Sequence, residues 1–276
     1  MSVTFIETDG IGLSSRVWRG LAFPYGPGFP RNMEGNPIIG HYDDFLKVGD
    51  TTLEDGYGRL TEHTGTLVQI ASEATAPGII QFATPADNDE VTIQLGNILD
   101  VGAFRLQKNF AFEARVRVDA EAIVAGDHGY FIGMATGGAS GCCITEKLFA
   151  ADAIYATANL VGFQHLAGES TALDAMYQAS GQTKVDGAVN TNLDTVQTLV
   201  AATWYKLGFR FQAARPRKLE WFVDGALVCS IKETAVAAAA FPDADAAFMQ
   251  PTIGMRGADA TAATMDVDWW ACAQYV

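Results

Sequence analysis

The chain has 276 residues, of which 49% are hydrophobic and 18% are charged, so it has ample apolar material for one large core. Its 28 glycines and 16 phenylalanines favour a turn-rich all-β protein over a helical one. The formal net charge of −14 opposes contact with a phosphate backbone, which excludes nucleic acid as the expected partner.

Nothing in the sequence predicts secretion or a membrane partner. The first ten residues lack a basic segment followed by an apolar one, and no run approaches roughly 18 apolar residues. The cysteines lack the CxxC spacing of a zinc site. We therefore expect folding in a reducing cytoplasm, with two of the cysteines acting as small buried hydrophobic residues, Cys229 and Cys272.

Residues 1–40 differ in composition from the rest of the chain. Glycine and proline at this density prevent regular elements, whereas aromatic side chains are rare in a fully solvated linker. We expect an irregular arm, and its aromatic residues are Trp18, Phe23, Tyr25 and Phe29. The arm either packs on its own domain or buries these side chains on a neighbouring subunit, and plain disorder is a third interpretation.

The first part of the remaining chain alternates polar and apolar residues in short runs. After an amphipathic piece at 41–49, this alternation predicts strands at 65–72, 78–83 and 91–95, and a short one at 104–106. The intervening PADNDE is interpreted as a polar hairpin turn. It also gathers the hard oxygen ligands that calcium prefers, so a calcium site is a minor alternative there, with candidate ligands Asp87, Asn88, Asp89 and Glu90.

The middle of the chain contains one clear strand and a long stretch with little pattern. Residues 109–119 carry apolar side chains on one face and charged ones on the other, which is typical of an outer strand in a sandwich. Residues 130–135 predict a buried strand. From 145 to 203 the pattern is weak: a short helix or a loop comes first, followed by strands at 159–165, 176–181 and 198–203.

The strongest pattern is a three-stranded meander between residues 204 and 231. Its strands alternate strictly, and Asp224-Gly225 has the composition of a two-residue hairpin turn. An alanine-rich run at 234–240 predicts one or two helical turns. Strands follow at 250–256 and 265–273, where strict alternation places Asp266, Asp268 and Trp270 on the same face. We therefore expect one antiparallel two-sheet sandwich domain over residues 41–276.

These segments resemble the concanavalin A-like, laminin G-like jelly roll. The resemblance is carried by FEARVRV, YFIGMA, WYKLGFRF, LEWFVDGALV and the final MDVDWWAC. The pattern also resembles a jelly-roll family of structural proteins from tailed-phage virions. That resemblance implies a capsid decoration protein, made in the host cytoplasm, that binds the major capsid protein on the virion surface. It also implies a homo-oligomer, with a trimer as the favoured form.

Reactive side chains do not form a recognisable catalytic set. The sequence contains two pairs of closely spaced acids, Glu220 with Asp224 and Asp266 with Asp268. Neither pair has a third acid at the spacing of a glycoside hydrolase. They are interpreted as a turn residue and a solvated outer face. The four histidines are scattered and are expected at surface or loop positions. We expect no enzyme activity and no cofactor.

The sequence leaves two questions about binding undecided, the role of a basic spot and the possibility of glycan binding. Arg215, Arg217 and Lys218 form a basic spot on an acidic chain, which is either a solvated turn or a contact for the acidic surface of a neighbouring subunit. The alternative function is a carbohydrate-binding module of the same fold. In that case exposed aromatic residues such as Trp270 would stack on the sugar rings of a glycan.

Overall fold

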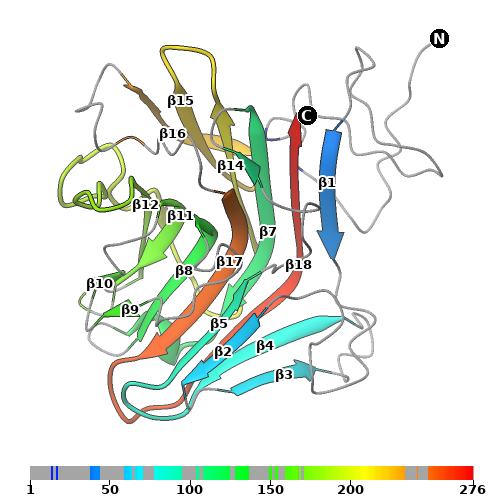
Figure 1. The fold of residues 1–276 in the computed structure, drawn as a ribbon. Coiled ribbons are helices and arrows are strands. Elements are labelled where there is room, and N and C mark those ends of the chain that lie inside the picture. Colours follow the sequence, from blue (N-terminus) through cyan, green and yellow to red (C-terminus); the bar gives the residue numbers. More distant parts are fainter. Residues whose placement is uncertain are drawn as a thin grey trace.

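Two antiparallel sheets pack face to face in the computed structural model, which confirms the expected all-β sandwich (Figure 1). The helix that the structure describes is the 3-10 turn η1 (Glu121–Ile123). Within the described part of the chain, no helix is long and apolar enough to cross a membrane. The structure describes residues 14, 17, 38–43, 59–63, 66–70, 78–94, 104–105, 108–124, 128–136, 149–150, 153–154, 159–166, 168, 171–233, 241 and 248–275.

The first sheet has eight strands, all paired antiparallel. Its order is β16 (Ala226–Lys232), β15 (Lys218–Val223), β14 (Tyr205–Gln212), β7 (Phe110–Val118), β18 (Ala263–Tyr275), β4 (Ile79–Thr84) and β3 (Thr66–Ile70). The eighth strand, β1 (Ile38–Asp43), pairs with the second half of β18. Residues 38–40, which the composition placed in the arm, therefore belong to this sheet.

The second sheet also has eight strands. Its order is β13 (Gln197–Thr198), β12 (Ala172–Gln178), β11 (Leu160–His165), β8 (His128–Thr136), β17 (Phe248–Gly257), β5 (Glu90–Gln94) and β2 (Arg59–His63), with β6 (Phe104–Arg105) beside β17. A separate two-stranded ribbon is formed by β9 (Phe149–Ala150) and β10 (Ala153–Ile154).

Aromatic side chains fill the space between the sheets. Phe112 of β7 stacks on Phe209 of β14 with ring centroids 5.4 Å apart, and both are fully buried. Trp221 of β15 is also fully buried and donates its indole N–H to the carbonyl oxygen of Gly162 in the opposite sheet, at 3.0 Å. This bond satisfies the polar atom of the largest core residue and ties the two layers together.

The predicted meander is confirmed as β14, β15 and β16. Asp224 and Gly225 have φ values of 48° and 75°, as a two-residue turn between right-twisted strands requires. Cys229 and Cys272 are buried free thiols, which confirms their expected role as hydrophobic residues. Cys142 and Cys143, and the helical turns expected at 234–240, lie outside the described residues.

The expected alternation in the last strand is wrong after Val267. The pairing of β18 with β7 slips between Val267 and Trp269, so Asp268 is an extra, bulged residue. A slip of one residue exchanges the two faces of a strand. As a result Trp270 is fully buried in the core, and it is not the exposed aromatic residue that the sequence led us to expect.

Two other strand predictions differ from the structure. The strand expected at 176–181 begins earlier, since β12 starts at Ala172. Of the strand expected at 198–203, only Thr198 lies in a strand, the two-residue β13, and Ala202 further along has a left-handed φ of 57° that is incompatible with an extended strand. The sequence analysis did not predict β1, β2, β9 or β10 as strands.

The strands β8 and β11 approach so closely that only glycine fits at one paired position. Gly133 and Gly162 lie opposite each other. A Cβ atom built on Gly133 would lie 2.3 Å from the carbonyl oxygen of Val161 and 3.0 Å from the ring of Phe131. The partner atoms are mostly backbone, which cannot move aside without disturbing the sheet.

We predict that Gly133→Ala lowers the free energy of unfolding by about 1–3 kcal/mol, because the added methyl group overpacks this position. Urea denaturation followed by circular dichroism measures the change. Gly168→Ala is the matched control, because no atom lies within 4 Å of the position of its Cβ. Equal stability of the two variants would contradict the close approach.

Candidate functional site

The described residues of the arm, Ser14 and Val17, pack on their own chain. The backbone N–H of Ser14 donates to Glu113 Oε2 at 2.9 Å on the outer face of the first sheet. Val17 is fully buried against Gly208, where an added Cβ would lie 3.0 Å from Val17 Cγ2. The expected contact residues of the arm lie outside the described residues, so their role stays a prediction: Trp18, Phe23, Tyr25 and Phe29.

The side chain of Arg217 is buried, in contrast to the exposed basic spot considered from the sequence. It is 5% exposed, donates to Glu233 Oε1 at 2.7 Å, and lies with its guanidinium carbon 5.3 Å from the centroid of Phe241. Hydrogen bonds from Arg217 hold the pKa of Glu233 well below its usual range. Lys218 pairs with Glu220. Of the three residues in the basic spot, Arg215 is the exposed one, and its contact with a neighbouring subunit stays a prediction.

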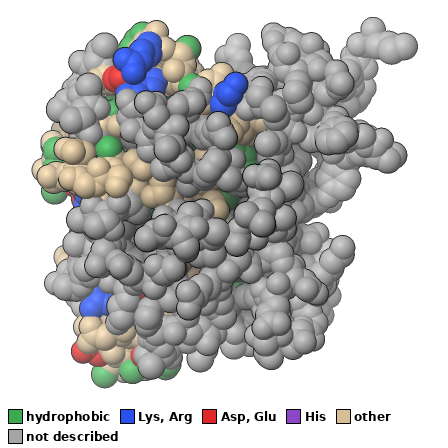
Figure 2. Space-filling model, viewed as in Figure 1, with side chains coloured by type: hydrophobic (Ala, Val, Ile, Leu, Met, Phe, Trp, Pro, Cys, Tyr) green, Lys and Arg blue, Asp and Glu red, His purple; other side chains and the backbone are tan. Residues whose placement is uncertain are grey.

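Lys and Arg side chains gather at the end of the molecule where β14 and β15 are joined (Figure 2). Glu220 lies within this region and accepts hydrogen bonds from Arg210 Nε and Gln212 Nε2, both at 2.9 Å. Burial disfavours the charged form of Glu220, but the donors Lys218 and Arg210 outweigh burial and hold its pKa below the usual range. This acid therefore serves as an internal anchor for the surrounding cations.

The polar segment PADNDE forms the predicted turn, which docks on the end of β17. Asn88 has a left-handed φ of 63°, and its backbone N–H donates to the carbonyl oxygen of Gly257 at 3.0 Å. Its side-chain oxygen accepts from Arg256 at 2.6 Å, so a guanidinium already supplies a cation there. Within the described residues, no group of three or more His, Cys, Asp or Glu side chains could hold a metal ion.

A second polar cluster covers the β11–β12 end of the outer face of the second sheet. Gln164 donates to Asp186 Oδ2 at 2.9 Å and accepts from Lys184 at 3.0 Å, while Lys184 pairs with Asp186 at 2.8 Å. Asp174 accepts from the backbone N–H of Thr195 at 2.7 Å. Burial raises the pKa of Asp174, yet its partners are backbone groups of its own chain. These contacts hold the connection between β12 and β13 against the sheet.

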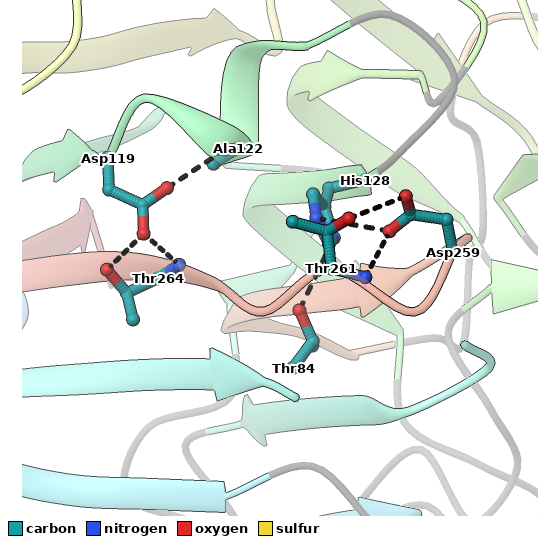
Figure 3. Close-up of polar contacts among 7 residues, drawn as sticks. All are labelled: Thr84, Asp119, Ala122, His128, Asp259, Thr261 and Thr264. Carbon is teal, nitrogen blue, oxygen red and sulfur yellow. Dashed lines mark hydrogen bonds and ion pairs between the residues drawn. The ribbon is translucent and has the colours of Figure 1, made fainter. Parts of the chain in front are cut away.

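Two of the histidines are buried, which corrects the expectation of surface or loop positions. His128 and His165 are both fully buried at strand ends. His128 Nε2 lies 3.9 Å from Asp259 Oδ1, and its Nδ1 lies 3.5 Å from Thr84 Oγ1 (Figure 3). His165 stacks on Tyr130 with ring centroids 4.7 Å apart, and burial lowers its pKa.

A neighbouring aspartate fixes the connection that follows β7. Asp119 accepts hydrogen bonds from the backbone N–H of Ala122 at 2.9 Å and from the N–H and hydroxyl of Thr264, both at 2.7 Å (Figure 3). It therefore joins η1 to β18. Asp119 and Asp259 both accept hydrogen bonds from nearby backbone N–H groups, so these two acids stabilise the loops at this end of the sandwich.

One surface with binding chemistry was missed in the sequence. Trp204 is half-buried at the start of β14, and the guanidinium carbons of Arg115 and Arg117 lie 4.6 and 4.7 Å from the centroid of its ring. Arg115 pairs with Asp268, and Arg117 Nε donates to Asp266 Oδ2 at 2.7 Å. We call this set, together with Gln81, the Trp204 platform. The signal was the alternation of β14, which puts Trp204 on the face opposite Tyr205.

The platform also corrects the interpretation of Asp266 and Asp268 as a solvated face. Asp266 is 6% exposed and accepts from Gln81 Nε2 at 3.0 Å in addition to Arg117. Asp224, another of the acids considered, accepts a hydrogen bond from the backbone N–H of Lys206 at 2.9 Å, which agrees with its predicted place in the turn. Each acid is thus held by a partner in its own chain.

Comparison with known proteins identifies the fold. No protein-family model matches the chain, and no curated protein matches it. An endo-1,3-β-glucanase from Streptomyces sioyaensis superposes with a TM-score of 0.55 at 10% identity, covering 92% of this chain and 99% of the enzyme. The potassium-bound Emp46p carbohydrate recognition domain gives 0.53 at 11% identity, over 83% and 94% of the two chains.

A protein of unknown function from Shewanella oneidensis MR-1 gives a TM-score of 0.53 at 14% identity, covering 87% of each chain. At these identities the likeness concerns the fold alone. The fold is the concanavalin A-like jelly-roll sandwich, as the sequence resemblance implied.

We predict that His165 makes stability depend on pH. Its folded-state pKa lies below the ordinary value of 6.5, so the unfolded chain binds the proton first as pH falls. The free energy of unfolding should therefore decrease below about pH 6.5, by at most about 1.4 kcal/mol per pH unit for this group, and level off below the folded-state pKa. Urea titrations at pH 5 to 8 measure this slope.

The variant His165→Gln serves as the comparison, because it removes the titrating group and retains hydrogen-bonding capacity. Its stability should fall less than that of the wild-type chain between pH 6.5 and 5. Parallel pH profiles for the two proteins would rule out a role for His165.

Proposed function

We propose that this chain is a non-enzymatic structural protein of a tailed-phage virion, a decoration protein that binds the capsid surface as a homo-oligomer. The proposal starts from the sequence resemblance to virion jelly-roll proteins, and the sandwich fold is consistent with it. The partner would be the major capsid protein. A trimer is the proposed oligomer.

The observation that carries the non-enzymatic part is that three buried acids are bonded within the chain. Asp174, Asp186 and Glu220 are held by backbone groups, a lysine or an arginine of the same chain. A general acid or nucleophile needs a carboxyl group directed at a substrate. These acids are instead directed at internal donors, which supports a role in binding and structure.

The arm supports the assembly part of the proposal. Ser14 and Val17 attach one part of the arm to the first sheet, through Glu113 and Gly208. The chain that follows carries the aromatic residues for which the sequence predicts a contact. Aromatic side chains are enriched at the centres of protein interfaces, because they bury large areas with few rotatable bonds.

We predict that replacing the four arm aromatics Trp18, Phe23, Tyr25 and Phe29 by serine converts a trimer into a monomer. The contacts of Ser14 and Val17 with the first sheet are retained, so the sandwich should unfold at an unchanged urea concentration. Size-exclusion chromatography with light scattering measures the mass against three chains of 29.4 kDa. Val17→Ala is the control: it should weaken packing on the sheet and leave the oligomer intact. A monomeric wild-type chain would contradict the proposal.

Binding to the capsid is tested by co-sedimentation with phage heads that lack this protein, prepared from a deletion of its gene. Saturable binding of the wild-type chain is expected. Arg215→Glu should reduce it if the exposed end of the β14–β15 connection takes part in the contact, and Lys232→Glu on the neighbouring β16 is the matched control. Absence of wild-type binding to such heads would refute the decoration role.

A second candidate function is carbohydrate binding, favoured by one specific feature of the surface. Trp204 has a half-buried indole ring next to side chains that can form hydrogen bonds. Trp270, the residue first considered for this role, is buried in the core. Glycan binding and a place on the virion are compatible, because adhesion requires only an exposed site.

A further inference from the structure

The Trp204 platform is a continuous row of side chains across four neighbouring strands. In register, Gln81 of β4 faces Asp266 of β18, and Asp266 faces Arg117 of β7. Tyr205 faces Val116, so Trp204, one residue before it, lies beside Arg117 on the outer face of the sheet. Four strands thus present one aromatic ring and a band of polar groups on the same side.

The indole ring of Trp204 is in contact with two arginines of the neighbouring strand β7. Both guanidiniums lie within cation–π distance of the ring, at 4.6 and 4.7 Å from its centroid. Each arginine is held in turn by an aspartate of β18, Asp268 for Arg115 and Asp266 for Arg117. The ring is only half-buried, so this support leaves part of it open to solvent. A rigid aromatic surface loses little entropy when a ligand stacks on it.

The charges of the platform balance. Two arginines are matched by two aspartates, on a chain whose net charge is −14. A phosphate or carboxylate ligand would find no excess positive charge here, and a cation would compete with arginines already in place. The chemistry instead fits a neutral ligand that has one apolar face and several hydroxyl groups.

We propose that the Trp204 platform binds a neutral hexopyranose unit of a glycan. The C–H face of the sugar ring stacks on the indole, whose π face carries partial negative charge. The side chains of Arg115 and Asp268, which are 34% and 16% exposed, lie where they can donate to and accept from the sugar hydroxyls. This proposal deepens the second candidate function and rests on it, because it names the site and the class of sugar.

The platform is open and shallow, so the affinity for a single chain should be low. A ligand lying on a sheet face buries far less of its surface than one in a pocket. We expect dissociation constants on the order of 0.1 to 1 mM for short oligosaccharides. Repeated copies in an oligomer would raise the apparent affinity for a polysaccharide through multivalency.

The test is isothermal titration of the full chain with three neutral probes, laminarihexaose, cellohexaose and maltohexaose, with trigalacturonate as the charged comparator. At least one neutral probe should bind, and the charged one should bind at least tenfold more weakly. Trp204→Ala should weaken binding at least tenfold, whereas Trp204→Phe should retain it within about threefold. Leu227→Ala, which removes a 47%-exposed side chain from another strand of the sheet, is the control and should bind like wild type.

The outcomes separate the site from the function. Binding of a neutral probe that survives Trp204→Ala would overturn this site and leave carbohydrate binding standing elsewhere on the chain. No binding of any neutral probe, or preferred binding of the charged one, would overturn both. Neither result affects the decoration role, which is decided by co-sedimentation with phage heads. Unchanged urea unfolding midpoints of the Trp204 variants exclude misfolding as the cause of lost binding.

Discussion

The indole–carbonyl bond between Trp221 and Gly162 is the interaction on which the arrangement of the two sheets depends. A buried indole N–H without an acceptor costs free energy, and for Trp221 the acceptor belongs to the opposite sheet. That geometry requires β11 to lie close, and its pairing with β8 at Gly133 and Gly162 leaves no room for side chains between them. Gly162 therefore takes part in both the close pairing of β8 with β11 and the bond between the sheets.

The polar side chains on the two outer faces of the sandwich are paired in different ways. On the first sheet, charged side chains pair across strands and contact a half-buried aromatic ring, as Arg115 and Arg117 do for Trp204. On the second sheet, polar residues such as Gln164 and Asp174 are buried, and a folded-back connection supplies their partners. The described polar groups of the first face therefore pair with one another across strands around Trp204, whereas those of the second face bond to a connection of the chain.

Much of the fold was predictable because its signals are local. The meander from 204 to 231 combines strict alternation with the turn chemistry of Asp224-Gly225, and both act within a few residues. The platform was not predictable, because Arg117 lies between Trp204 and Asp266 only after β14, β7 and β18 have paired in register. The burial of Arg217 was missed for the same reason: its partner Glu233 belongs to a different strand end, and a local basic run gives no sign of it.

The bulge at Asp268 has a consequence for how the gene for this protein can change. Before the bulge the odd-numbered residues of β18 point into the core, and after it the even-numbered residues do. The extra residue therefore keeps both Met265 and Trp270 on the interior side of the sheet. Loss of that codon would turn the carboxyl-terminal strand inside out, whereas replacing it by another codon would preserve the phase. Natural homologues should therefore vary in residue type here while conserving the length of this strand.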